Sequence, residues 1–199
     1  MHWKAAAAAA LLAACVHAHA QGPAGEARQL HDTIVKSRDN RGRPFAIVDK
    51  KDARIFVYDG AGHLRGETAA LLGQASGDDS APNVGEHAQE GNVPFEERTT
   101  PAGRFAAEPG VNAQGEPIIW VDYDTAFAIH RVRPGRAEAA RKVRLAKGTP
   151  AERRVSYGCV VVPVRFYEDV VQRWLGKGRS VVYVMPENES VEEAFGSSL

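Results

Sequence analysis

Apolar residues recur at helical spacing near the start of the chain and in short runs further along it. Residues 24–38 place Ala27, Leu30 and Ile34 on one face, which predicts a short amphipathic helix that ends in the polar stretch 39–44. Beyond it, short β-rich runs alternate with Gly and Asp turns, a pattern typical of a meander of strands. Strands are expected at residues 45–48, 54–58, 68–72, 103–107, 118–121, 126–130, 159–162 and 180–184.

Two segments between the strands lack this pattern. Residues 77–98 contain six acidic residues and no periodicity, which predicts a long surface loop. Residues 131–154 carry nine basic residues against Glu138 and Glu152, and a helix is expected over residues 136–147.

The C-terminal part of the chain predicts one more helix. Residues 164–175 fit a helix that stops at Gly176 and leads into the last strand. The short acidic tail beyond Pro186 is expected to be frayed.

Length and composition are those of a single globular domain. The chain has 199 residues, of which 44% are hydrophobic and 25% charged, which argues against wholesale disorder. Lys plus Arg and Asp plus Glu both number 25, so the chain lacks the basic excess of a general nucleic-acid binder. The 19 Gly and 11 Pro residues favour a strand-rich, turn-rich fold over a helical bundle.

The first twenty residues have the pattern of an export signal. Lys4 precedes twelve apolar residues, too few to span a bilayer but typical of a signal-peptide core. The Ala-His-Ala sequence ending at Ala20 is a cleavage signal that would release a soluble chain. The Leu-Ala-Ala-Cys sequence ending at Cys15 resembles a lipobox, and lipidation there would tie the protein to a membrane. Both readings predict export, to the periplasm or the cell envelope.

Cys159 is the one thiol besides Cys15, so it has no intramolecular partner once the signal is removed. Such a thiol is buried and inert, forms a disulfide with another chain, or serves as a reactive group. Gly158 permits a tight turn that presents backbone N–H groups to an oxyanion. His130 ends a predicted strand, and an imidazole can take the proton of a thiol. From these residues alone, a nucleophile and a buried structural cysteine both remain open.

Three blocks of the sequence stand in an order that is found in one enzyme family. The first is 47–50 with 54–58, which resembles an opening hairpin, and the second is Thr-Pro-Ala-Gly-Arg-Phe at 100–105, which resembles a TPxGxF segment. The third is His130 followed by Ser-Tyr-Gly-Cys at 156–159, which resembles a His…SxGC signature. Together they resemble the L,D-transpeptidase (YkuD-type) catalytic domain of bacterial cell-wall enzymes.

The resemblance implies a mainly β fold, a β-sandwich of the L,D-transpeptidase catalytic type with a few peripheral helices, bordering on α+β. The resemblance covers residues 45–185, which would be the catalytic domain. The residue patterns add a signal peptide at 1–20, an N-terminal helix and linker at 21–44 and an acidic tail at 186–199.

The resemblance also implies a reaction. Cys159 would be the nucleophile, His130 its base and later the acid, and N–H groups in the turn formed by Ser156, Tyr157 and Gly158 would form the oxyanion hole. The thiolate would attack the third residue of a peptidoglycan tetrapeptide stem, expel the terminal D-Ala and pass the acyl group to an amine, giving a 3-3 cross-link. No cofactor and no metal are implied, and the sequence contains no P-loop, dinucleotide fingerprint or zinc spacing.

Other residues near these blocks are candidates for substrate binding. Trp120 and Tyr123 are expected to be core and strand residues, with lining of the cleft as the alternative. Arg131 begins the basic segment, which either recognises carboxylates or is a solvated face. Ser156 is expected to shape the turn, and Tyr157 to shape the pocket or to pack.

The sequence departs from the family pattern in the third block. Val161 stands where an Arg or Asn is usual, and valine offers no polar contact. Tyr157 replaces a frequent His, Arg131 replaces a small residue, and the basic segment lengthens the His-to-Cys interval. Two alternatives therefore accompany the acyltransferase: an L,D-carboxypeptidase or other hydrolase on the same scaffold, and a catalytically silent peptidoglycan-binding protein.

Overall fold

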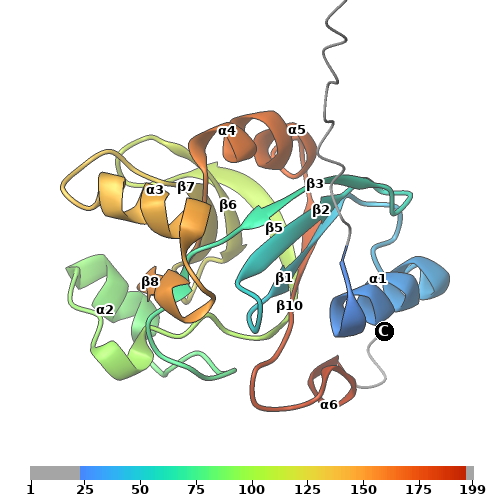
Figure 1. Ribbon diagram of the computed structural model, residues 1–199, viewed down its shortest axis with the longest axis horizontal. Coiled ribbons are helices and arrows are strands. Elements are labelled where there is room, and N and C mark those ends of the chain that lie inside the picture. The colour runs from blue at the N-terminus through green and yellow to red at the C-terminus, as the bar shows by residue number, and fades with distance from the viewer. Residues whose placement is uncertain (1–22, 196–199) are drawn as a thin grey trace, which may run out of the picture.

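The computed structural model describes residues 23–195 and centres on one mixed sheet (Figure 1). The strand order is β3-β2-β1-β10-β5-β6-β7-β9, in which β1 runs parallel to β10, β7 runs parallel to β9, and the other neighbours are antiparallel. The strands are β1 (Phe45–Asp49), β2 (Arg54–Tyr58), β3 (Leu64–Ala69), β5 (Gly103–Val111), β6 (Pro117–Asp122), β7 (Phe127–Arg131), β9 (Val160–Val162) and β10 (Ser180–Val184). A separate parallel ladder joins β4 (Leu72–Gly73) to β8 (Arg154–Ser156).

Short helices surround the sheet. They are α1 (Gly25–Ser37), α2 (Val84–Glu90), η1 (Phe95–Glu97), α3 (Glu138–Lys147), η2 (Ala151–Arg153), the continuous stretch of α4 (Val164–Phe166), η3 (Tyr167–Val171) and α5 (Gln172–Trp174), and α6 (Val191–Phe195). The prediction of a mainly β fold with a few peripheral helices is confirmed. None of the helices within residues 23–195 has the length and apolar character needed to cross a membrane.

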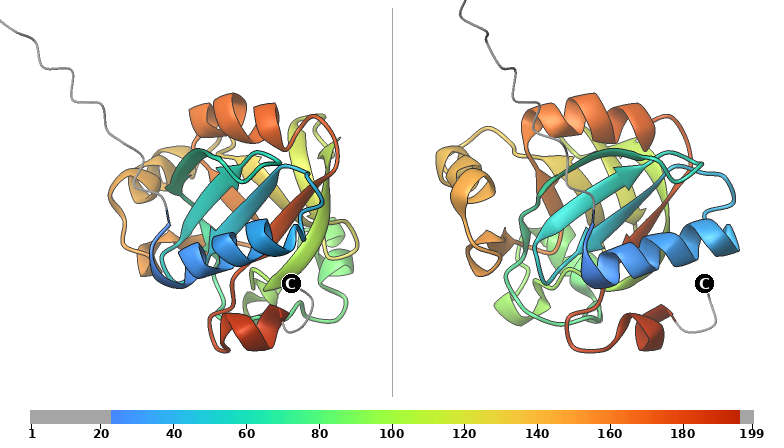
Figure 2. Two further views of the ribbon diagram at one scale, coloured as in Figure 1. Left: turned by 90° about the vertical axis from the view of Figure 1, so that its right-hand side faces the viewer. Right: turned by 45° about the vertical axis from the view of Figure 1, so that its right-hand side comes forward.

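The sheet curls around its main hydrophobic core (Figure 2). Alternate residues of β1, β2 and β10 contribute to this core, and so do alternate residues of β6, β7 and β9 at the other end of the sheet. Tyr167 and Val171 from η3 close it on one side. The two ends of the sheet therefore face each other across one core, as the layers of a sandwich do.

A second core lies under α1, on the outer face of β1, β2 and β10. Leu30 and Ile34 pack there against Phe45, Tyr58 and neighbouring side chains. The predicted amphipathic helix over residues 24–38 is thus confirmed, together with its apolar face.

The expectation of a frayed tail beyond Pro186 is wrong for residues 187–195. Residues 191–195 form α6, and Phe195 is 3% exposed in the core under α1. One buried aromatic ring anchors a segment whose charge suggested a solvated end.

The expectation of an irregular loop over residues 77–98 is wrong in part, because α2 and η1 form there. Val84 and Val93 are buried, and Gly85 packs so closely that an added Cβ would lie 1.9 Å from the carbonyl oxygen of Asp124. Both helices are too short to show periodicity in the sequence.

The strand expected at 68–72 divides into two pieces. β3 ends at Ala69, and Leu71 then exchanges both backbone hydrogen bonds with Val161 before β4 begins. The other predicted strands, the helix in the basic segment and the helix after Pro163 are all present. The signal peptide expected at residues 1–20, with Cys15, lies outside the described residues.

Candidate active site

Neighbouring strands bring His130 and Cys159 to one face of the sheet. His130 of β7 is the Cα partner of Val161 on β9, and Cys159 precedes Val161 by two positions. Side chains alternate along a strand, so His130, Val161 and Cys159 point to the same side. Strand spacing and rise place the Cα atoms of His130 and Cys159 roughly 8 Å apart, within reach of their side chains.

The hydrogen bond of His130 defines its tautomer. Its Nδ1 lies 2.8 Å from the carbonyl oxygen of Arg131, which can only accept, so Nδ1 carries the proton and Nε2 keeps a lone pair. Burial, reinforced by the positive charge of Arg133, lowers the pKa of His130 to about 4. The imidazole is therefore neutral at pH 7, with Nε2 ready to accept a proton.

Cys159 is a reduced, half-buried thiol. Its Sγ–H donates to the carbonyl oxygen of Ala126 at 3.6 Å, and burial raises the pKa of the thiol above its ordinary value. In the resting protein the thiol and the imidazole are therefore both neutral, and each is hydrogen-bonded to a backbone carbonyl. Ala126 has a positive φ of 56°, which is unusual for alanine and marks local strain beside the sulfur.

The sulfur is carried by a tight turn, residues 156–159, called the Cys159 turn below. The Oγ–H of Ser156 donates to the carbonyl oxygen of Cys159 at 2.6 Å, and the N–H of Gly158 donates to the same Oγ at 3.2 Å. Gly158 has φ +122°, and an added Cβ would lie 2.9 Å from the carbonyl oxygen of Thr99. Glycine is therefore required, and Ser156 binds the turn to itself.

Thr100 and Lys50, which were not among the predicted site residues, support the Cys159 turn from the protein interior. The hydroxyl of Thr100 donates to the carbonyl oxygen of Gly158 at 2.8 Å and accepts the N–H of Gly73 at 2.8 Å. The ammonium of Lys50 donates to the carbonyl oxygen of Thr100 at 2.9 Å. Thr100 opens the Thr-Pro block at 100–105 and Lys50 ends the block at 47–50, and membership of these blocks was the available sequence signal.

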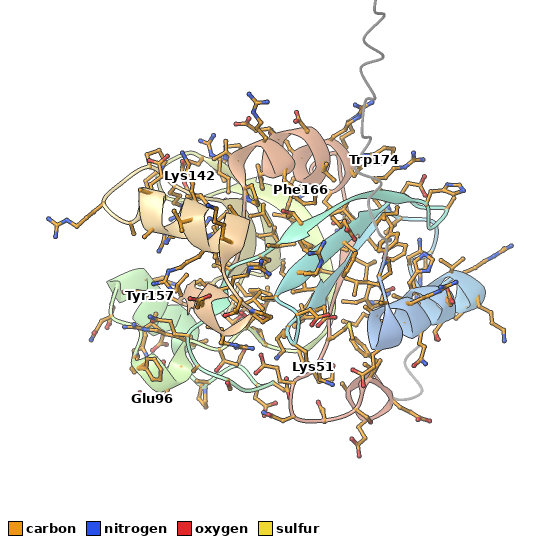
Figure 3. The ribbon with its side chains drawn as sticks, viewed as in Figure 1. Lys51, Glu96, Lys142, Tyr157, Phe166 and Trp174 are labelled. Carbon is orange, nitrogen blue, oxygen red and sulfur yellow. The ribbon has the colours of Figure 1, made fainter. Side chains whose placement is uncertain are left out.

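Tyr157 points away from the core and lies beside α2 (Figure 3). Its side chain is 54% exposed, and the guanidinium carbon of Arg98 lies 3.9 Å from the ring centroid. A narrow cleft next to the turn is lined by Tyr157 and Gly158 together with Val84 of α2. The acidic segment at 77–98 thus forms one wall beside the Cys159 turn.

Of the three candidate substrate-binding residues, two lie on the Cys159 face. Trp120 is the Cα partner of Ala128, which shares its face with His130. Tyr123 packs edge-on against Trp120, with ring centroids 5.0 Å apart. Tyr123 is 73% exposed, so its expected place in the core is a wrong prediction. Trp120 is half-buried, and the two rings form an aromatic edge on the Cys159 face.

Arg131 lies on the opposite face of β7. It follows His130 along the strand, and its guanidinium pairs with Glu116 and with Glu168 of η3, each at 3.2 Å. The structure therefore separates Arg131 from the sulfur and binds it to two carboxylates.

Val161 is covered by the basic segment. It is 2% exposed and packs in a cluster with Leu71, Val132 and Leu145, the last of which comes from α3. A polar side chain at this position would point into apolar surroundings. Arg133 of the same segment pairs with Glu116 at 3.3 Å. Its positive charge adds to the lowering of the pKa of His130, and it opposes, without overcoming, the rise that burial causes in the pKa of Cys159.

Metal-ligating side chains do not cluster in the described part of the chain. Between residues 23 and 195, no group of three or more His, Cys, Asp or Glu side chains has an arrangement that could hold a metal ion.

Comparison with known proteins gives distant structural likenesses. No protein-family model and no curated protein matches the chain. The helical cell shape determining protein Pgp2 from Campylobacter jejuni is 13% identical with a TM-score of 0.45, over 80% of this chain and 56% of that one. The chain thus spans little more than half of that protein.

Two other solved structures show the same range of similarity. The catalytic domain of an E. faecium L,D-transpeptidase is 20% identical with a TM-score of 0.35, over 72% of this chain and 98% of that one. A fused Zn-dependent amidase/peptidase/peptidoglycan-binding domain-containing protein from Clostridium acetobutylicum is 12% identical with a TM-score of 0.37, over 78% and 62%. At these identities and TM-scores the likenesses carry no inference about family or activity.

Proposed function

We propose that this chain is an exported cysteine acyltransferase that acts on peptidoglycan stem peptides, in the manner of L,D-transpeptidases. The observation that carries the proposal is the placement of Cys159 and His130 on one face of adjacent strands, with Nε2 of a neutral imidazole free to accept a proton. The contact between Thr100 and Gly158 adds support, because it joins two of the three sequence blocks that resemble the family.

The first step begins from a protonated thiol. Sγ turns from the carbonyl of Ala126 toward His130, and its proton passes to Nε2 as the sulfur attacks the carbonyl carbon of the third stem residue. The backbone N–H groups of Tyr157 and Cys159 are the donors suited to the oxyanion, since the N–H of Gly158 is bound to Ser156. The tetrahedral intermediate then collapses to a thioester, and the departing D-Ala amine takes the proton from His130.

The second step reverses the roles. An amine of a second stem attacks the thioester carbonyl and gives its proton to Nε2 of His130, which returns it to the departing sulfur. The result is an amide cross-link and a regenerated thiol. The exposed edge formed by Trp120 and Tyr123 is suited to hold one of the two stems against the Cys159 face.

Hydrolysis on the same scaffold is the second candidate. Cys159 is only half-buried as a residue, so water could replace the amine at the thioester and make the protein an L,D-carboxypeptidase. A peptidoglycan-binding role without turnover is the third alternative, and it predicts retention on cell-wall material that does not depend on the thiol.

The test is mass spectrometry of tetrapeptide muropeptides after incubation with the purified protein and with its Cys159→Ala variant. Cross-linked dimers that require Cys159 are the expected product. Tripeptides that require Cys159 would indicate the hydrolase instead. Unchanged muropeptides in the presence of folded wild-type protein would contradict both enzymatic assignments and leave the binding role.

A further inference from the structure

Thr100 connects the Cys159 turn to the protein interior through one side-chain hydroxyl. The residue is fully buried, and its Oγ both donates to the carbonyl oxygen of Gly158 and accepts the N–H of Gly73. The Gly158 carbonyl belongs to the peptide bond that leads into Cys159, so its direction helps to set the orientation of the Cys159 N–H. Water cannot replace a hydroxyl that is shielded from solvent, and its removal leaves two backbone groups unpaired.

Thr100 is itself held by a buried ammonium. Lys50 follows β1, its side chain is 0% exposed, and all three of its protons are used. Its Nζ donates to the carbonyl oxygen of Gly77 at 2.7 Å, to Oδ1 of Asp78 at 2.6 Å and to the carbonyl oxygen of Thr100 at 2.9 Å. A buried charge without partners would be very costly, and here each donor has an acceptor.

Asp78 extends these contacts to two more segments. Its carboxylate accepts the N–H groups of Glu187 and Asn188, both at 2.8 Å, and its carbonyl oxygen accepts the N–H of Ala102 at 2.8 Å. The pair formed by Lys50 and Asp78 thus joins the end of β1, the start of the acidic segment, the Thr-Pro block and the chain after β10. Thr100 connects the pair formed by Lys50 and Asp78 to the Cys159 turn.

We propose that Thr100 is a positioning residue for the Cys159 turn and that Lys50 holds Thr100 in place. Neither side chain touches the reacting atoms. Thr100 acts through the carbonyl of Gly158, and Lys50 acts through the carbonyl of Thr100. The effect on turnover rests on the function proposed above, whereas the effect on the geometry of the thiol does not.

The first experiment compares Thr100→Val, which has nearly the same shape without the hydroxyl, with Thr100→Ser, which keeps it. The rate of Cys159 alkylation by iodoacetamide at pH 8 is measured by mass spectrometry that maps the modified residue, and muropeptide turnover is measured in parallel. The control is Ile34→Val, which removes a methylene from the core under α1 and so lowers stability without contact with the turn.

In Thr100→Val we expect turnover to fall by about tenfold or more, while Cys159 alkylation accelerates by about threefold or more because the sulfur leaves its buried place. Thr100→Ser should return both rates toward wild type, and Ile34→Val should change neither. Folded Thr100→Val protein that is alkylated at the wild-type rate, or more slowly, overturns the proposal. If wild-type protein turns over no muropeptide, the proposed function fails, and the alkylation rates still decide the positioning role.

The second experiment removes Lys50 without leaving the Asp78 carboxylate buried and unpaired. Asp78→Asn retains an oxygen that can accept from Lys50 and from the N–H of Glu187. Lys50→Met in the Asp78→Asn background then removes the bond to Thr100 and leaves a neutral, hydrogen-bonded amide. Lys51→Met serves as the matched control, because Lys51 lies at the surface (Figure 3) and pairs there with Glu26.

We expect the double variant to be alkylated at Cys159 about threefold faster than Asp78→Asn alone, with thermal unfolding showing that both proteins are folded at the assay temperature. Lys51→Met should match wild type. Equal alkylation rates in the double variant and Asp78→Asn overturn the role given to Lys50.

Discussion

His130 and Val161 are partners across β7 and β9, and their side chains share the face of the sheet that carries Cys159. One end of this face is open at Trp120 and Tyr123, and the other is covered where Leu145 of α3 packs on Val161. The basic segment between His130 and the Cys159 turn therefore covers Val161, the position at which the L,D-transpeptidase pattern has a polar side chain. Under the function proposed above, a stem peptide would approach Cys159 from the open side.

The base role of His130 is tested by His130→Gln. The amide cannot take the thiol proton, so we expect muropeptide turnover to fall by at least about 100-fold while the protein stays folded. The measurement is kcat/KM together with circular dichroism. His63→Gln is the matched control, because His63 is largely exposed and pairs with Asp59 in the loop between β2 and β3. Turnover by His130→Gln close to wild type would remove His130 from the mechanism.

The ionisation of Cys159 gives a second prediction. Burial raises the pKa of the thiol above its ordinary value of 9.0, so the thiolate fraction should still be rising above pH 9. The pH dependence of Cys159 alkylation by iodoacetamide, followed by mass spectrometry, measures this directly. A midpoint near neutral pH would show a preformed thiolate and would contradict the neutral resting pair described above.

Stability in acid gives a third prediction. The pKa of His130 falls from its ordinary 6.5 to about 4 on folding, so between these values the unfolded chain binds the extra proton and the folded protein does not. Stability is fully present above pH 6.5 and is lost as the pH falls toward 4. The full difference corresponds to about 3 kcal/mol.

Denaturant unfolding at pH 7 and at pH 4.5 measures this loss. His130→Gln has no imidazole to protonate, so its free energy of unfolding should depend less on pH over the same interval. An identical pH dependence in wild type and in His130→Gln would assign the acid sensitivity to other groups.

The buried position of Val161 gives a fourth prediction. Val161→Asn places an amide in the cluster of Leu71, Val132 and Leu145, where it finds no partner, so we expect a loss of roughly 2 kcal/mol in unfolding free energy and no gain in turnover. Val143→Asn is the control, because Val143 lies on the outer side of α3 and is 61% exposed. Increased turnover in a stable Val161→Asn protein would show that the side chain reaches the substrate.

Local patterns in the sequence determined most of the secondary structure and the choice of Cys159 and His130 as the candidate pair. The spacing of Leu30 and Ile34 predicted α1, and runs of β-branched residues predicted most of the strands. Cys159 after a glycine and His130 at a strand end were recognisable as candidates because a lone thiol and an imidazole carry their chemistry in the residue type. Such signals depend on neighbours along the chain.

The tertiary structure alone decided what surrounds that pair. Strand register turned Arg131 away from the sulfur, packing of α3 buried Val161, and a turn after β6 exposed Tyr123. Thr100 contacts Gly158 only because the fold brings together two segments that are 58 residues apart in the sequence. These contacts depend on which strands pair and in which register, and pairing over such separations is set by the burial of the whole core rather than by any local run of residues.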